Sequence, residues 1–276
     1  FGVAPERDLP TFQRETLVDW FADRGGCAVT PSDAVDQVLL FPDTFTNYSY
    51  PGPGKAAVEL LEAADVYVEM ADVGPSGRAA FSLGLLEKAR ERARRNVDAL
   101  APRVAEGWSV LFVEPSDAVM FQDEYGDLLD GEDVAAVGAS AYGVCEYLDV
   151  HRVDDRVDFE GGEDFEGTAD HLTYHGHCNQ KATNKDHHTA AVLRRAGYEV
   201  DHLDSSCCGM AGSFGYEAEH YDLSKAIGEI LYDQVEDSPG DEVVAPGASC
   251  RTQLEDRPDG DRPPHPVERL RDALAE

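Results

Sequence analysis

The sequence predicts an α/β fold built of two tandem βαβ-type repeats, each with a mainly parallel sheet flanked by helices. Short β-prone runs bounded by turn residues alternate with helical stretches, which is typical of parallel sheets. Two segments about 133 residues apart follow the same order of elements. The chain has 276 residues, of which 42% are hydrophobic, and can therefore bury a substantial core.

Each repeat is predicted to hold three strands and two helices. In the first repeat we expect strands at 38–41, 66–68 and 110–113, and helices at 56–61 and 86–100. In the second we expect strands at 172–174, 198–200 and 243–245, and helices at 190–195 and 223–231. Apolar residues spaced by three and four predict the buried faces of the longer helices, namely Leu86, Ala89, Ala93, Val97 and Leu100, then Leu223, Ile227, Ile230 and Leu231.

The repeats predict four regions. Residues 1–34 are a linker with an N-terminal helix, and 35–121 are the first repeat. Residues 122–170 connect the repeats through a helix around 134–148 and an acidic loop near Gly161 and Gly162. Residues 171–276 are the second repeat, and only this repeat has cysteines after its strands.

The charge of the chain excludes some classes of partner. With 55 acidic and 23 basic side chains the net charge is −32, so we expect no binding to nucleic acid or to anionic lipid. The acidity is typical of a folded surface adapted to high salt. The sequence shows neither a signal peptide nor a transmembrane stretch, and a start without Met suggests a piece of a longer polypeptide, which we expect in the cytoplasm.

Four cysteines of the second repeat directly follow predicted strands: Cys178, the adjacent pair Cys207 and Cys208, and Cys250. Parallel strands end at one edge of the sheet, so these thiols should converge into a site for a soft metal. Adjacent cysteines suit an iron-sulfur cluster better than one tetrahedral zinc ion, although zinc and unrelated free cysteines stay open as alternatives. Gly209 would let the backbone approach the site closely.

The first repeat has no thiolate at the equivalent positions, which are Thr44, Pro75, Ser76 and Asp117. We expect Asp117 to be a solvated loop carboxylate, with ligation of a harder ion as the alternative. Cys27 and Cys145 lie outside the repeat register; Cys145 is expected to be a small buried residue, and Cys27 receives no assignment.

Charged side chains beside these motifs leave two further questions open. His177 precedes the first cysteine and either hydrogen-bonds a cluster sulfur or only packs and caps. Residues 87–95 form a basic helix, for which we expect pairing with nearby carboxylates rather than a docking face.

The motifs Gly176–Ala182, Cys207–Glu217 and Ser249–Arg251 closely resemble the CCG cysteine-rich domain family. That family includes a subunit of heterodisulfide reductase and the iron-sulfur subunits of glycolate oxidase, lactate-utilisation proteins and anaerobic glycerol-3-phosphate dehydrogenase. The resemblance covers residues 35–274. Within the family, the sequence most resembles the C-terminal part of a haloarchaeal protein in which an FAD-linked oxidase is fused to an Fe-S oxidoreductase. Two departures stand out: the first repeat lacks its CCG turn and later cysteine, and Asn179 replaces a frequent histidine.

The resemblance implies a 4Fe-4S cluster, of the cubane or the noncubane kind, on Cys178, Cys207, Cys208 and Cys250, with Gly209 and His177 beside it. It implies no catalytic residue in this chain, which would relay electrons for a flavin-linked 2-hydroxy-acid dehydrogenase of glycolate or D-lactate type. FAD would lie in a partner domain, with a ferredoxin-like domain on the same polypeptide and a quinone or other carrier as acceptor. Such partners could hold the chain at the inner face of the membrane.

Three other functions stay open. The first is a heterodisulfide-reductase-like catalytic subunit, in which the cluster itself cleaves a disulfide. The second is the iron-sulfur subunit of an anaerobic glycerol-3-phosphate dehydrogenase. The third is a redox-silent assembly module that holds zinc or no metal.

Overall fold

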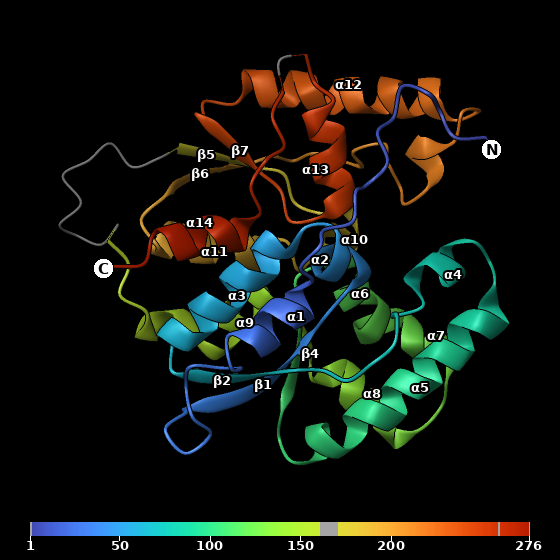
Figure 1. The fold of residues 1–276 in the computed structure, drawn as a ribbon. Coiled ribbons are helices and arrows are strands. Elements are labelled where there is room, and N and C mark those ends of the chain that lie inside the picture. The colour runs from blue at the N-terminus through green and yellow to red at the C-terminus, as the bar shows by residue number, and fades with distance from the viewer. Residues whose placement is uncertain (1, 161–170, 259, 276) are drawn as a thin grey trace. The chain divides into compact units, whose positions relative to one another are not determined.

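In a computed structural model, which describes residues 2–160, 171–258 and 260–275, the chain divides into two units (Figure 1). We call Phe12–Asp158 the N-terminal unit, and Phe1–Thr11 with Phe159–Glu276 the C-terminal unit. The loop glycines Gly161 and Gly162 lie outside the described residues. Both units are α/β, and every strand pair within their sheets is parallel, which confirms the predicted fold class.

The N-terminal unit contains a four-stranded sheet in the order β2-β1-β3-β4. Its strands are β1 (Asp36–Phe41), β2 (Val66–Met70), β3 (Ser109–Phe112) and β4 (Ala141–Gly143). Its helices are α1 (Leu17–Asp23), α2 (Thr44–Tyr48), α3 (Pro51–Ala63), α4 (Arg78–Ser82), α5 (Leu86–Ala105), α6 (Pro115–Val119), α7 (Tyr125–Leu128), α8 (Glu132–Ala139) and α9 (Val144–His151), with a π-helical turn at Met120–Glu124 and a 3-10 turn at Val153–Arg156.

The central strand β1 is buried on both faces, as expected for a parallel sheet covered by helices. All four residues from Val38 to Phe41 are buried. Leu39 and Phe41 pack in one core cluster with Ala93 and Val97 of α5. The predicted buried face of α5 is confirmed except at Leu86, the first residue of the helix, which is exposed.

The predicted helix around 134–148 is wrong, because a strand interrupts it. Helix α8 ends at Ala139, and β4 then pairs with β3 in the register Val110↔Ala141. Gly143 begins α9, where the Glu146 side chain accepts the Gly143 N–H at 3.1 Å. The apolar residues of 134–148 are spaced as in a helix. Residues 141–143 nevertheless form a strand, because they pair with the edge of β3.

The C-terminal unit contains a three-stranded sheet in the order β6-β5-β7, with α12 and α13 on one side and α11 and α14 on the other (Figure 1). Its strands are β5 (His171–Tyr174), β6 (Glu199–His202) and β7 (Glu242–Val244). Its helices are α10 (Cys178–Ala182), α11 (His187–Arg195), α12 (Tyr221–Asp237), α13 (Ala248–Glu255) and α14 (Pro266–Asp272), with a 3-10 turn at Phe214–Tyr216.

Helix α12 does not bury the whole face that its spacing predicts. Leu231 is buried, but Leu223 and Ile230 are more than half exposed. The helix instead packs through the small residues Ser224 and Gly228. At Gly228 an added Cβ would collide with the side chain of Gln253 on α13, so close approach of the two helices fixes the buried face.

The first eleven residues belong to the C-terminal unit. Val3 forms an antiparallel bridge with Glu217, and the Ala4 N–H donates to the Tyr216 carbonyl at 2.8 Å. Arg7 is buried, where it pairs with Asp256 and donates to the Gln253 side chain at 2.7 Å. This anchoring holds the segment after the cysteine turn in place.

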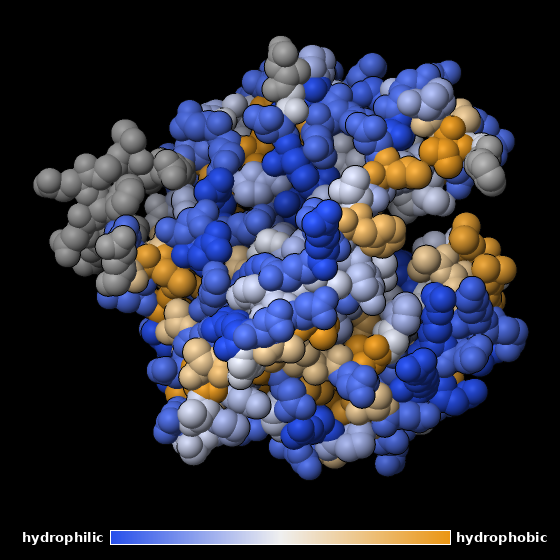
Figure 2. Space-filling model, in the orientation of Figure 1, coloured by the Kyte–Doolittle hydropathy of each residue, from blue (hydrophilic) through white to orange (hydrophobic). Residues whose placement is uncertain are grey.

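The face drawn in Figure 2 is mostly hydrophilic, in keeping with the acidic composition. An apolar patch lies over the corner between α4 and α5, where Leu83, Leu85 and Leu86 are exposed. In the neighbouring basic stretch Arg90 pairs with Glu87 at 2.6 Å, so some of the pairing predicted for this helix is present.

Candidate metal centre

The four cysteines of the C-terminal unit lie at one edge of its sheet. Cys178 begins α10 four residues after β5, Cys207 and Cys208 follow β6, and Cys250 lies in the first turn of α13 after β7. Since β6, β5 and β7 are parallel neighbours, their carboxyl ends share this edge. All six cysteines of the chain are free thiols, and Cys27 and Cys145 lie in the N-terminal unit.

The four thiols contact one another in a chain, Cys178 to Cys207, Cys207 to Cys208, and Cys208 to Cys250. The Cys178 thiol, and then the Cys208 thiol, donate to Cys207 and lower its pKa to about 2. The Cys208 thiol similarly holds the pKa of Cys250 well below its usual range. The pKa values of the other two, Cys178 and Cys208, are raised by hydrogen bonding to their neighbours and by burial. Neighbouring thiols thus favour ionisation of Cys207 and Cys250, and the thiolate is the form that binds a metal.

The adjacency of Cys207 and Cys208 bears on which metal group the site suits. A tetrahedral zinc usually takes ligands two to four residues apart, whereas neighbouring thiolates can bind different irons of one cluster. Among the described residues, only Glu217, Glu219 and His220 form a set of three or more His, Cys, Asp or Glu whose ligand atoms all lie within 4.8 Å of one another.

Gly209 has the conformation that the turn requires. Its φ is +97°, and its N–H donates to the Cys207 sulfur at 3.4 Å. A Cβ at this position would lie 2.5 Å from the Ser224 carbonyl oxygen of α12. Only glycine therefore lets the cysteine pair pass so close to the helix while its N–H points at sulfur.

His177 is buried beside Cys250. Its Nδ1 accepts the Asn179 N–H at 3.2 Å and caps α10, so in the neutral ring the proton is on Nε2. A Cβ on Gly247 would collide with the His177 ring and lie 3.4 Å from the Cys250 sulfur, so the ring edge and the sulfur both lie next to the same point beside Gly247. His177 thus caps α10, and whether it also donates to a cluster sulfur stays a prediction.

A polar network behind Cys250 was not singled out by sequence reasoning. His175 is fully buried, and its Nδ1 lies 2.7 Å from the Ser205 hydroxyl. After the Cys208 thiol, the His175 ring is among the groups that lower the pKa of Cys250. Lys181 donates to that hydroxyl at 3.0 Å and to the Ser205 carbonyl at 2.6 Å. The signal in the sequence was a histidine directly after a buried strand, three residues before a cysteine.

The equivalent edge of the N-terminal unit carries oxygen ligands in place of sulfur. The prediction that Asp117 is solvated is wrong, because its side chain is buried and accepts a hydrogen bond from Ser76. Asp43, next to the predicted position Thr44, is buried as well. Burial first, and then mutual repulsion with acidic neighbours, raises the pKa of Asp43 to about 7 and that of Asp117 to about 8.

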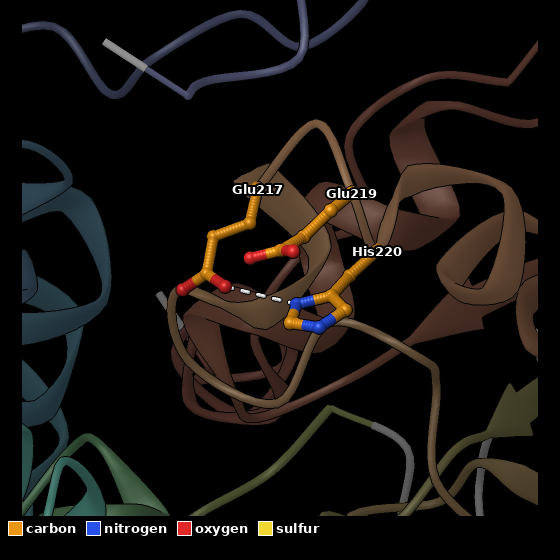
Figure 3. A group of neighbouring side chains, drawn as sticks. All are labelled: Glu217, Glu219 and His220. Atoms are coloured by element: carbon orange, nitrogen blue, oxygen red, sulfur yellow. Dashed lines mark ion pairs between the residues drawn. The ribbon is translucent and has the colours of Figure 1, made fainter.

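Figure 3 shows the compact group Glu217, Glu219 and His220 in the turn before α12. The His220 Nδ1 lies 2.9 Å from a Glu217 carboxylate oxygen, and its ring stacks on Phe214 at 4.1 Å. Glu219 is exposed beside this pair. The ion pair and the stacking account for the grouping, which supplies no thiolate to the cysteine site.

The site thus combines four thiols at one sheet edge, a glycine turn after the cysteine pair and a histidine that caps α10. Residues 172–255 match the CCG cysteine-rich domain family. The matched segment contains all four cysteines, and it confirms the resemblance predicted from their motifs. The match extends from β5 to the end of α13 and so includes the sheet of the C-terminal unit.

Around this domain the chain is similar to oxidoreductases and their subunits from Escherichia coli K12. It is 28% identical to a subunit of anaerobic glycerol-3-phosphate dehydrogenase over 98% of the chain and 66% of that protein. It is 27% identical to D-2-hydroxyglutarate dehydrogenase over 84% of the chain and 22% of that protein. It is 27% identical to the glycolate oxidase iron-sulfur subunit over 74% of the chain and 50% of that protein. The chain thus spans 66% or less of each of these relatives.

None of the helices in the described part of the chain has both the length and the apolar character needed to span a membrane. The longest, α5, has 20 residues and carries Lys88, Arg90 and Arg92 in its first half.

Proposed function

We propose that the C-terminal unit holds one iron-sulfur cluster on Cys178, Cys207, Cys208 and Cys250, and that the chain relays electrons for a flavin-linked dehydrogenase. The observation that carries the proposal is the convergence of four free thiols from three strand ends, each interacting with a neighbouring thiol. Similarity to the glycolate oxidase iron-sulfur subunit supports it independently.

The residues of the site divide into an inner and an outer pair. Cys208 and Cys250 are buried and would anchor the group, whereas Cys178 and Cys207 are only half-buried. The outer pair leaves an edge of the site near the surface, where a redox partner can approach. Bound there, the cluster supplies acceptance and release of single electrons.

Backbone and side-chain donors would stabilise the thiolates. The Gly209 N–H already points at Cys207, and His177 and His175 lie beside Cys250. Hydrogen bonds to the sulfurs favour the reduced, more negative state and so raise its potential. We assign no catalytic residue to this chain, because these groups serve the sulfurs.

The oxidisable substrate would bind to a partner domain that carries FAD, with a ferredoxin-like domain and a quinone or another carrier completing the path. We infer a 2-hydroxy acid as the substrate class, because two of the relatives are named for D-2-hydroxyglutarate and glycolate. The proposal places the chain in the cytoplasm, or at the inner face of the membrane through its partners.

A second candidate is the iron-sulfur subunit of an anaerobic glycerol-3-phosphate dehydrogenase. The similarity to the subunit of that enzyme covers 98% of this chain, more than the other two similarities cover. The two candidates share the relay and differ in the flavin partner. Reduction of the loaded chain by the purified parent enzyme with glycolate, D-lactate, D-2-hydroxyglutarate or glycerol 3-phosphate separates them.

Anaerobic reconstitution with iron and sulfide tests the site. We expect about four irons per chain and a paramagnetic resonance signal on reduction, both lost in Cys207→Ser and Cys250→Ser. Cys27→Ser is the matched control, because Cys27 is a free, half-buried cysteine of the N-terminal unit whose sulfur accepts the Val68 N–H at 3.3 Å. Zinc in place of iron, no metal, or equal iron in all variants would contradict the proposal and favour an assembly module.

A further inference from the structure

Three strand ends of the N-terminal unit bring oxygen ligands together. Asp43 follows β1, Ser76 follows β2 and Asp117 follows β3. These strands are parallel neighbours in the order β2-β1-β3, so their carboxyl ends share one edge. The cysteines of the other unit occupy the same place on their own sheet.

These side chains are buried, and one of their oxygens has no partner. The exposed fractions of Asp43, Ser76 and Asp117 are 1%, 6% and 8%. The Asp43 Oδ1 accepts the Thr46 N–H at 2.8 Å, but its Oδ2 is buried without any hydrogen bond. A buried carboxylate oxygen without a donor is costly, and it is the kind of atom that a bound cation would satisfy.

In the part of the chain that the structure describes, the acidic groups that act on one another at this edge outnumber the basic ones. Glu114, also buried, faces Asp43 and Asp117 and adds to their repulsion. The positive charge of Arg78 lowers the pKa of Asp117. Its guanidinium, however, already pairs with Glu124 and donates to the Ser116 carbonyl at 3.1 Å. Three crowded acidic side chains therefore share this edge with one arginine, which is already paired with another carboxylate.

We propose that the N-terminal unit binds a hard divalent cation, of the Mg²⁺ or Mn²⁺ class, between the carboxylates of Asp43 and Asp117 and the Ser76 hydroxyl. Carboxylate and hydroxyl oxygens select such ions, and no thiolate follows these strands. Asp43, Glu114 and Asp117 do not form a set with all ligand atoms within 4.8 Å of one another. The proposed ion uses two carboxylates and completes its shell with water, which is the usual way Mg²⁺ binds.

Terbium luminescence tests the site, because Tb³⁺ is a hard cation whose emission is sensitised by a nearby tyrosine. The Tyr125 hydroxyl donates to the Ser76 carbonyl at 2.7 Å and accepts from Asn96, so its ring lies beside the proposed ion. The full chain is titrated with Tb³⁺ in molar KCl, which screens weak binding to the acidic surface. Mg²⁺ and Mn²⁺ are then added as competitors.

We expect saturable emission that Mg²⁺ and Mn²⁺ displace, and affinity at least about tenfold weaker in Asp43→Asn and Asp117→Asn. Asn keeps the helix cap at position 43 and the shape at 117, so both variants should fold. Tyr125→Phe should lose the emission while Mn²⁺ binding, followed by paramagnetic resonance, persists. Asp127→Asn, at an exposed site of the same unit, is the matched control.

Emission that does not saturate, or that falls equally in Asp117→Asn and Asp127→Asn, would overturn the proposal and leave the carboxyls holding protons only. Persistence of Mn²⁺ binding at full affinity in both Asp43→Asn and Asp117→Asn would overturn it as well. The experiment needs no iron-sulfur cluster, so its result is independent of the proposed function.

Discussion

At the scale of single residues, the two sheet edges show how side-chain chemistry distinguishes similar backbones. One edge places thiols after its strands, where hydrogen bonds from neighbouring thiols lower the pKa of Cys207 and of Cys250. The other places Asp43 and Asp117 in a dry environment, where burial favours their neutral forms. Sulfur and oxygen at matching positions thus prepare one edge for a soft group and the other for a hard ion or a proton.

His175→Leu should lower the reduction potential of the reconstituted cluster. The substitution removes a buried donor beside Cys250, and fewer hydrogen bonds to the sulfurs destabilise the reduced state. It also leaves Ser205 without one partner, which should cost about 1–3 kcal/mol of unfolding free energy. Potentiometric titration with optical detection measures the first effect. His188→Leu, on α11, is the control; an unchanged potential with full iron content would refute the role of His175.

Asp117→Asn should change how stability depends on pH when divalent ions are removed with EDTA. The folded chain holds the Asp117 proton up to a pKa of about 8, whereas the unfolded chain releases it near the ordinary value of 3.8. The wild type therefore loses stability as pH rises between these values, because the unfolded state binds fewer protons. The variant cannot ionise there and lacks this loss.

The difference should grow in favour of Asp117→Asn from pH ~5 to pH ~8, by up to about 1.4 kcal/mol for each pH unit, and level off above pH ~8. Urea unfolding at a series of pH values measures it. Asp127→Asn serves again as the exposed control. Parallel pH profiles for wild type and Asp117→Asn would show that this carboxyl is not held protonated.

At the scale of elements, strands and helices that follow from local sequence pattern could be predicted. Elements that form only through pairing or packing with distant residues could not. The runs at 38–41 and 172–174 became β1 and β5, and the cysteines fell after their strands as expected. Strand β4 was missed, because three residues between two apolar helical stretches carry no signal until they pair with β3. The buried state of Asp117 and the polar support of Cys250 were missed for the same reason: burial arises from packing, which a loop sequence does not show.

The turn after the cysteine pair offers a test within one loop. Gly209→Ala forces a left-handed residue with a Cβ 2.5 Å from the Ser224 carbonyl, so α12 must shift. Gly212→Ala is the matched control, since its φ of +69° is also left-handed but no atom lies within 4 Å of the added Cβ. The control should cost about 1–2 kcal/mol and Gly209→Ala clearly more, with loss of reconstituted iron. Urea unfolding and iron analysis check both, and equal costs would show that the approach to α12 is not tight.

At the scale of the whole molecule, charge dominates. The chain carries 55 acidic and 23 basic side chains, and its ion pairs, such as Arg90 with Glu87, use only part of that acidity. The remaining carboxylates repel one another in the folded state more than in the expanded unfolded chain. The hydrophobic core of each unit must therefore keep that unit folded against a long-range repulsion that salt can weaken.

Stability should accordingly rise with KCl concentration. The screening length falls from about 10 Å at 0.1 M to about 3 Å at 1 M, so repulsion between separate surface carboxylates nearly vanishes over this range. We expect the Tm to increase steadily with KCl, and to increase less in a variant with Asp130→Asn, Glu132→Gln, Asp222→Asn and Glu229→Gln, which removes four exposed negative charges. Sucrose at equal osmolality separates screening from general solute exclusion, because it stabilises both proteins alike. A Tm that is independent of KCl, or that rises equally in the two proteins, would show that surface repulsion does not limit the stability of this fold.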